Sequence, residues 1–129
     1  MTDPIADMLI RIKNAQAVLH PSVEIPHSKL KYKLANILLE SNFITSVEKK
    51  RNKINKIIKI GLKYDKKEPV IEELRRVSKP GRRIYTEAKK IRSPRGGRGM
   101  VIVSTPKGLM AGEEARKKNL GGEIICELW

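Results

Sequence analysis

Apolar residues recur every three to four positions in two segments of the N-terminal half, which predicts two helices. The first helix opens at Asp3 and Pro4, because Asp caps free backbone N–H groups and Pro suits the first helical position. It ends before Pro21, and the second helix begins after Ser28, whose hydroxyl can act as its cap. The predicted buried faces are Ile5, Met8, Leu9 and Ile12 in the first helix, and Leu30, Leu34, Ile37 and Leu38 in the second.

Alternation of apolar and polar residues predicts three strands in the same half. Val23 and Ile25 alternate with polar neighbours, and residues 43–48 and 54–64 follow the second helix, joined by a basic turn at residues 49–53. The predicted order is α-β-α-β-β. The polar segment 65–69 is the expected boundary, which makes residues 1–66 an N-terminal domain and residues 67–129 a C-terminal domain.

The C-terminal half is predicted to be mostly β with one short helix, so the fold class is α+β. Residues 70–77 fit a strand and a helix equally well. The remaining predicted segments are a tight turn at 78–81, an extended piece at 82–85, a flexible basic loop at 92–99, a buried strand at 100–103, a loop at 104–108, a helix at 113–119 and a strand at 123–129.

The positive charge is concentrated in the middle of the chain. The 129 residues include 28 Lys and Arg against 14 Asp and Glu, a net charge of +14. Residues 1–48 and 100–129 are each neutral overall, so residues 49–99 carry the whole excess. Such a block indicates a polyanionic partner, most often a nucleic acid. A solvated surface without any partner is the alternative interpretation.

The composition argues against an enzyme, a metal site and a cofactor. One Cys, two His and no CxxC or HExxH pattern leave no recognisable metal ligands. The Gly-rich stretch at 96–99 lacks the Lys-Ser/Thr of a phosphate-binding loop, and Cys126 is expected to be a buried, inert thiol. The N-terminal segment does not fit a signal peptide and no apolar run could span a bilayer, so we expect a cytoplasmic protein with neither a membrane nor a small-molecule partner.

The segment 104–108 is the main candidate for recognition. Ser104 and Thr105 follow a buried strand, and small hydroxyls can bond to base edges and ribose 2′-OH groups. Lys107 can meet a phosphate, and Gly108 permits close backbone approach. An ordinary strand-to-helix turn explains the segment equally well, Pro106 included, and both interpretations stay open.

Structured RNA is the nucleic acid that fits best. Aromatic residues are too few for a base-stacking platform, and Tyr85 beside Arg82 and Arg83 is the best stacking candidate. The Arg and Lys residues between 49 and 99, among them Lys53 and Arg82, are predicted to make salt-sensitive phosphate contacts together with Lys29 and Lys31. DNA is compatible with the charge alone. The rival function is a basic interaction module that binds an acidic protein or an anionic membrane surface.

Four ordered motifs resemble the family of bacterial small-subunit ribosomal protein eight. They are Asp3 to Leu9 with Arg11 to Asn14, Arg76 to Gly81 continuing to Tyr85, Val103 to Gly108, and Gly121 to Cys126. The resemblance extends over essentially the whole chain and is weakest over residues 43–67.

The resemblance implies two small α/β domains packed together and a non-enzymatic role in assembling the small subunit. It implies direct binding to the central domain of 16S ribosomal RNA beside neighbouring ribosomal proteins and, in some members, repression of the messenger RNA of the same operon. The family loop reads Ser-Thr-Ser-x-Gly, and Pro106 replaces its third hydroxyl residue. The positions implied to contact RNA or support the contact are Ser104, Thr105, Gly108, Tyr85, Gly121, Gly122, Glu123, Ser28 and Lys29.

Overall fold

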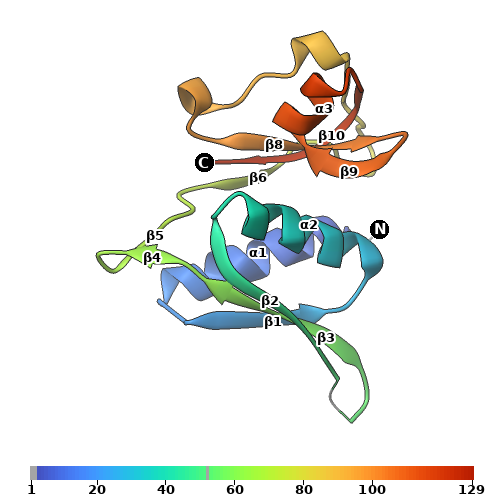
Figure 1. Cartoon of the computed structure of the whole chain (residues 1–129). Helices are drawn as coiled ribbons and strands as arrows, with labels where there is room; N and C mark the ends of the chain where they lie inside the picture. The colour runs from blue at the N-terminus through green and yellow to red at the C-terminus, as the bar shows by residue number, and fades with distance from the viewer. Residues whose placement is uncertain (1–2, 52) are drawn as a thin grey trace. The chain divides into compact units, whose positions relative to one another are not determined.

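The structure is a computed structural model that describes residues 3–51 and 53–129, and it divides into two compact units. The N-terminal unit is residues 4–71, and the C-terminal unit is residues 72–129 together with Asp3. The mixed α+β class and the α-β-α-β-β order of the first elements are confirmed. Figure 1 shows the elements, which in chain order are α1 (Pro4–Ala17), β1 (Ser22–Pro26), α2 (Lys29–Glu40), β2 (Ile44–Arg51), β3 (Lys56–Leu62), β4 (Tyr64–Asp65), β5 (Glu68–Pro69), β6 (Leu74–Arg76), β7 (Tyr85–Thr86), β8 (Met100–Thr105), β9 (Gly108–Ala111), α3 (Gly112–Lys117) and β10 (Gly122–Leu128).

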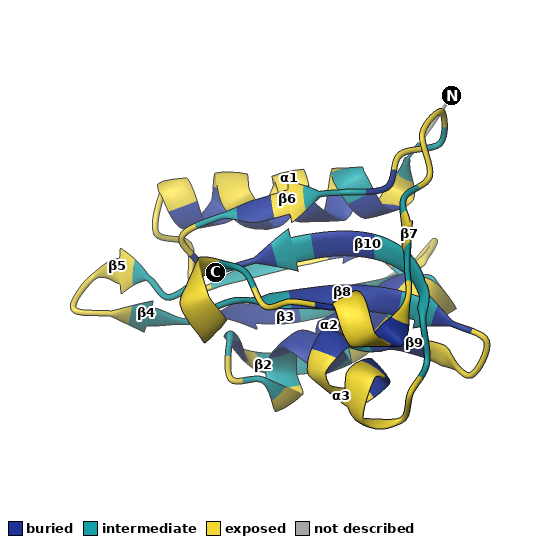
Figure 2. Cartoon of the chain, turned by 90° about the horizontal axis from the view of Figure 1, so that it is seen from above, coloured by how far each residue is buried: buried dark blue, intermediate teal, exposed yellow. Residues whose placement is uncertain are grey.

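The N-terminal unit packs α1 and α2 against an antiparallel sheet in the order β1-β3-β2 (Figure 1). Every predicted apolar position of α1 is buried, and Figure 2 shows α1 with a buried and an exposed face. In α2 the prediction is wrong for Leu30, which is 47% exposed, because the buried stripe of this helix runs through Lys31, Leu34, Ala35 and Leu38. Ser28 caps α2 as expected: its Oγ accepts a hydrogen bond from the Lys31 N–H at 3.1 Å.

The basic turn predicted at residues 49–53 is mostly strand. Lys49, Lys50 and Arg51 continue β2 and pair with residues at the start of β3, while Asn52 lies outside the described residues. Strand pairing overrides the polar composition here because β3 offers a free edge of N–H and C=O groups. The polar segment at 65–69 forms a small hairpin of β4 and β5, with Lys66 and Lys67 both at positive φ.

The C-terminal unit is built on a sheet in the order β6-β10-β8-β9, and β7 also pairs with β10. The ambiguous segment 70–77 contains the strand β6. A short helix is present as predicted, but α3 begins at Gly112 and ends at Lys117. Buried side chains beneath it form a core of Ile91, Val101, Val103, Met110 and Ala115, with Leu120 and Ile124 packed against it.

One predicted loop of this unit differs from the structure. Residues 104–108 do not lead into a helix, because β8 turns back directly into β9, a strand absent from the prediction. Residues 92–99 lie between β7 and β8 without any strand or α-helix, as predicted, and include a tight turn at Arg95–Gly97. Among the described residues, no helix has both the length and the apolar character that crossing a membrane requires.

Candidate nucleic-acid interface

Three of the sequence-predicted site residues form one row across the sheet of the C-terminal unit. Glu123 on β10 is the register partner of Tyr85 on β7 and of Ser104 on β8. Residues directly opposite each other in antiparallel strands project from the same face. Tyr85, Glu123 and Ser104, which we call the polar row, therefore stand side by side although they are far apart in the sequence.

Two glycines allow the strands that carry the polar row to approach closely. A Cβ built on Gly122 would overlap the carbonyl oxygen of Ser104 and lie 2.9 Å from its carbonyl carbon. A Cβ on Gly121 would lie 2.5 Å from the carbonyl oxygen of Thr86. Real Cβ atoms do not occupy such positions against backbone, so both residues support the site through their lack of a side chain.

Ser78 holds the loop that presents the basic residues beside Tyr85. Its side chain is fully buried, accepts the Ile84 N–H at 2.8 Å and donates to the Ile84 carbonyl at 3.2 Å. The same Ile84 carbonyl accepts the N–H of Ile124 at 2.9 Å, which ties the loop to β10. The sequence predicts only a turn at Ser78. Its role in holding the loop depends on the hydrogen bonds between its hydroxyl and the backbone of Ile84, six residues further along the chain.

The presented side chains combine an exposed ring with charged groups. Tyr85 is 70% exposed. Arg83 Nη1 donates to Glu123 Oε2 at 3.0 Å, so the carboxylate of the polar row carries a partner, and Arg82 is exposed. An exposed aromatic ring beside arginines, in one row with a hydroxyl, is suited to stacking on a base while the basic groups meet phosphates.

The turn between β8 and β9 is shaped by the hydroxyl of Thr105. Its Oγ1 donates to the Gly108 carbonyl at 2.8 Å and accepts the Lys107 N–H at 3.1 Å, and the residue is only 8% exposed. Gly108 has a φ of +112°, a backbone conformation that favours glycine. Pro106 and Lys107 are exposed at the tip, so Thr105 holds the turn while its neighbours face solvent.

The predicted N-terminal residues occupy different environments. Lys29 and Lys53 are exposed, as a phosphate contact requires. Lys31 is 7% exposed and its Nζ donates to the Pro26 carbonyl at 3.3 Å, so its charge is directed into the unit. We therefore leave Lys31 out of the phosphate contacts proposed below.

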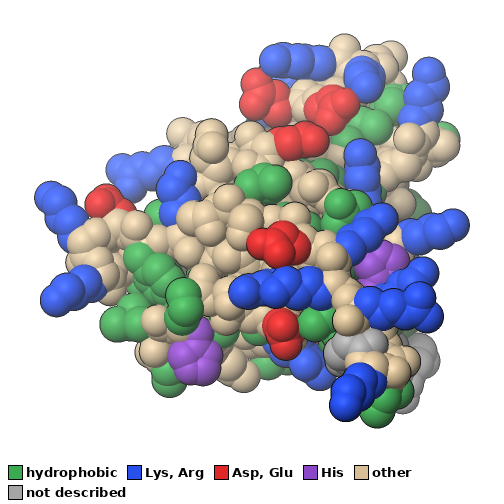
Figure 3. Space-filling model, turned by 60° about the horizontal axis from the view of Figure 1, so that its bottom comes forward, with side chains coloured by type: hydrophobic (Ala, Val, Ile, Leu, Met, Phe, Trp, Pro, Cys, Tyr) green, Lys and Arg blue, Asp and Glu red, His purple; other side chains and the backbone are tan. Residues whose placement is uncertain are grey.

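A basic pocket of about 230 Å³ lies beside the β2–β3 hairpin and was missed by the sequence analysis. It is lined by His27, Lys49, Lys50, Arg51 and Lys56. The Nζ of Lys49 lies 4.4 Å from the ring centre of Tyr32, a cation–π contact. Figure 3 shows Lys and Arg side chains gathered on this part of the molecule. The pairing of β2 with β3 creates the pocket, and no local spacing signals it.

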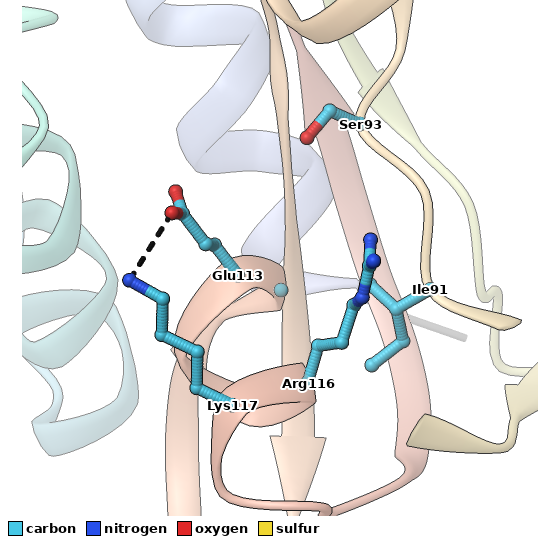
Figure 4. Close-up of a pocket in the computed structure, with 6 residues that line it drawn as sticks. Ile91, Ser93, Glu113, Arg116 and Lys117 are labelled. Atoms are coloured by element: carbon cyan, nitrogen blue, oxygen red, sulfur yellow. Dashed lines mark ion pairs between the residues drawn. The ribbon is translucent and has the colours of Figure 1, made fainter. Parts of the chain in front are cut away.

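A second pocket, of about 500 Å³, lies between α3 and the segment before β8 (Figure 4). Its lining includes Ile91, Ser93 and Arg116, and Glu113 forms an ion pair with Lys117 at 3.3 Å. No group of three or more metal-ligating side chains occurs in the described parts of the chain. Burial raises the pKa of the Cys126 thiol to about 12, while Arg76 lowers it and Glu127 raises it. A neutral buried thiol is a poor nucleophile, as expected for Cys126.

Comparison with known proteins decides the family. A family model described as Ribosomal protein S8 matches residues 3–129. The chain belongs to this family. The S8 family is a family of ribosomal proteins rather than of enzymes, which agrees with the absence of enzymatic activity expected from the sequence.

Curated relatives match over the full length. A protein named small ribosomal subunit protein uS8 from Dictyoglomus turgidum is 49% identical over 129 residues, covering 100% of this chain and 98% of the relative. Proteins of the same name from Caldanaerobacter subterraneus subsp. tengcongensis and Flavobacterium johnsoniae are 51% and 49% identical over 130 residues, covering 100% and 99% of this chain and 98% of each relative. The resemblance noted in the sequence motifs is confirmed.

Proposed function

We propose that this chain is a constituent of the small ribosomal subunit in the cytoplasm and binds directly to the central domain of 16S ribosomal RNA. The names of its relatives, which describe small-subunit ribosomal proteins, support the first part. The observation that carries the second part is the polar row, because it brings Tyr85, Glu123 and Ser104 onto one face of one sheet.

The polar row and the adjoining turn suit recognition of a folded RNA. Tyr85 offers an exposed ring for stacking, and the Ser104 hydroxyl can donate to and accept from a ribose 2′-OH or a base edge. Lys107, exposed at the tip of the β8–β9 turn, can meet a phosphate. Thr105 takes the role of a positioning residue, because its hydroxyl already bonds within the turn.

Affinity for the phosphate backbone would come from both units. The N-terminal unit holds 14 Lys and Arg against six Asp and Glu, and the C-terminal unit holds 14 against eight. Lys29, Lys53 and the basic pocket beside the β2–β3 hairpin supply exposed cations in the first unit. These contacts carry little sequence information, so they add salt-dependent affinity while the polar row adds recognition.

Neighbouring small-subunit proteins are expected partners in the assembled particle. A surface that recognises RNA shape would also bind a second RNA of the same fold, so repression through the chain's own operon messenger RNA is part of the proposal. Lys31 is left out, and the proposed RNA contacts are otherwise the residues predicted from the sequence: Ser104, Pro106, Lys107, Gly108, Tyr85, Arg82, Ser28, Lys29 and Lys53, with Thr105, Gly121, Gly122 and Glu123 in support.

The test is to recover the full chain from cells at native salt and to sequence the RNA that accompanies it. We expect enrichment of one region within the 16S central domain, and enrichment of the operon messenger if repression operates. Recovery of an acidic protein or anionic lipid without RNA would support the rival basic interaction module instead. RNA recovered in proportion to its cellular abundance, without an enriched region, would contradict specific binding.

A further inference from the structure

Trp129 forms a cluster with two arginines from distant parts of the C-terminal unit. The guanidinium carbon of Arg95 lies 4.7 Å from the ring centre, and that of Arg75 lies 5.2 Å from it. The Trp129 backbone is fixed as well, because its N–H donates to the Glu73 carbonyl at 3.2 Å and its carbonyl accepts the Glu72 N–H at 2.7 Å. The backbone that carries the ring is therefore held in place, and both arginine side chains lie against the ring.

The backbone of residues 94–99 is folded in a way that places Arg95 on this platform. Arg95, Gly96 and Gly97 have consecutive positive φ angles of 54°, 62° and 95°. The N–H groups of Gly97 and Gly99 both donate to the Pro94 carbonyl, at 3.3 and 3.2 Å. A Cβ on Gly99 would lie 2.9 Å from Cβ of Trp129, so glycine lets this segment pack against the end of the sheet.

The cluster leaves cationic groups without local compensation. Arg75 pairs with Glu127 at 3.3 Å, which balances its charge. Arg95 and Arg98 are exposed and form no ion pair within residues 3–51 and 53–129. They lie in the segment 88–99, which contains five Lys and Arg residues and no Asp or Glu. Stacking engages the face of a guanidinium and leaves its N–H donors free at the edge, where they match a phosphate bidentately.

The surroundings of Arg95 favour the backbone of a nucleic acid over a protein. A Cβ built on Gly96 or Gly97 would meet nothing within 4 Å, so no side chain obstructs an approaching strand. An acidic protein segment would be expected to use apolar neighbours as well, and residues 95–98 present only two glycines between two arginines.

We propose that Arg95 and Arg98, positioned by Trp129, bind the phosphate backbone of RNA at a contact that includes no residue of the polar row. The proposal rests on the function proposed above and adds a second RNA contact within the C-terminal unit. Stacking on Trp129 restricts the Arg95 side chain before binding, which lowers the ordering cost of the phosphate contact.

Trp129 itself provides the readout, because it is the only Trp in the chain. The full chain is titrated with a transcript of the 16S central domain and, separately, with a mixed-sequence RNA duplex, and Trp129 emission is recorded. We expect both RNAs to change the emission, since a phosphate drawn to Arg95 alters the cation–π contact. Arg95→Gln should abolish this change and reduce the slope of log affinity against log salt by about 0.7–0.9, the value for one phosphate contact.

Two variants act as matched comparisons. Arg95→Lys keeps the positive charge but not the planar guanidinium group. The slope of log affinity against log salt should therefore be retained, while the change in Trp129 emission is reduced. Lys66→Gln removes the same charge from another exposed residue with positive φ, at 51°, and should leave the Trp129 response intact. Circular dichroism checks that each variant is folded, and Arg98→Gln gives an independent test of the slope.

The outcomes separate this contact from the proposed function. Binding of the central-domain transcript with unchanged Trp129 emission, or an unchanged salt slope in both Arg95→Gln and Arg98→Gln, would overturn the contact while leaving the function standing. Absence of binding to either RNA would overturn both. A response to the duplex and the transcript alike, lost in Arg95→Gln, is the result we expect.

Discussion

Gly122 offers the sharpest test of how the C-terminal sheet builds its candidate RNA interface. Replacing it with Ala adds a single methyl group between β10 and β8. That methyl would overlap the Ser104 carbonyl oxygen and lie 2.9 Å from the carbonyl carbon and 3.2 Å from Cα of Thr105. All three neighbours are backbone atoms, so the added volume cannot be absorbed by a change of side-chain rotamer.

The strands must therefore separate at the polar row. Ordinary van der Waals contact needs about 3.5–4.0 Å between carbon atoms, so β8 and β10 would move apart by several tenths of an ångström or more. Overpacking a well-packed site costs about 1–3 kcal/mol. At a urea m value of about 1.5 kcal/mol per molar, the unfolding midpoint of the C-terminal unit should fall by about 0.7–2 M.

The assay is urea unfolding followed by Trp129 emission, together with the affinity for the 16S central-domain transcript. Because the displaced backbone carries Ser104 and the start of β10, affinity should fall about tenfold or more, equivalent to about 1.4 kcal/mol. Gly81→Ala is the matched control, since a Cβ there meets nothing within 4 Å and its φ lies outside the left-handed region. Gly81→Ala should keep the wild-type midpoint and affinity.

A Gly122→Ala protein with the wild-type urea midpoint would refute the steric argument. A lowered midpoint with unchanged RNA affinity would refute the link between strand spacing and the polar row. Loss of stability in Gly81→Ala by the same amount would show that glycine replacement in this unit is destabilising even where the new methyl group meets no neighbour, and would remove the contact with Ser104 as the cause.

Three other predictions address the turn, the ring and the thiol. Thr105→Val should lower the free energy of unfolding by about 1–2 kcal/mol, measured by urea titration, and should weaken RNA binding, measured by a binding titration. Thr105→Ser, which keeps the hydroxyl bonded to the Gly108 carbonyl, should retain the stability and the affinity. Tyr85→Ala should leave the urea midpoint unchanged, since the ring is 70% exposed, but weaken RNA binding by about 1–3 kcal/mol, and Tyr85→Phe should restore it. Because burial raises the pKa of Cys126 to about 12, the unfolded thiol releases its proton at lower pH than the folded one, so stability should fall from about pH 9 upward. Urea midpoints at about pH 8 and pH 10 should show this loss, and Cys126→Ala should reduce it.

Local patterns were sufficient to predict most of the elements. The apolar positions of α1 recur at helical spacing and are all buried, and Ser28 caps α2 as its side chain and position indicate. These features depend on neighbours three or four residues apart, which the sequence displays directly. Leu30 fits the same periodicity and is exposed, because the buried stripe of α2 runs through Lys31 and Leu34 instead.

Features that depend on strand pairing could not be predicted. The strand β9 is four residues long and follows a two-residue turn containing Pro106, so its residues read as part of a loop. The polar row joins residues from three strands, and its register depends on how closely Gly121 and Gly122 let those strands approach. Residue types indicated Tyr85 and Ser104 separately, but only the sheet brings them together.

Lys31 is the most buried of the predicted phosphate contacts, and its burial could not be predicted from the sequence either. Lys31 has the residue type and the sequence neighbourhood of an exposed cation, yet it occupies the buried side of α2 and bonds to the Pro26 carbonyl. The cluster of Arg75, Arg95 and Trp129 is equally invisible in the sequence, since its members come from three separate segments.

We propose that the polar row recognises one RNA fold while other cations supply general affinity. The ratio of two affinities of the full chain, for the 16S central-domain transcript and for a scrambled RNA of equal length, tests this claim most directly. The wild-type chain should prefer the transcript, Tyr85→Ala should lose most of that preference, and Lys53→Gln should weaken both affinities and keep the ratio. Equal affinities of the wild-type chain for the two RNAs, or a ratio unchanged by Tyr85→Ala, would contradict the claim.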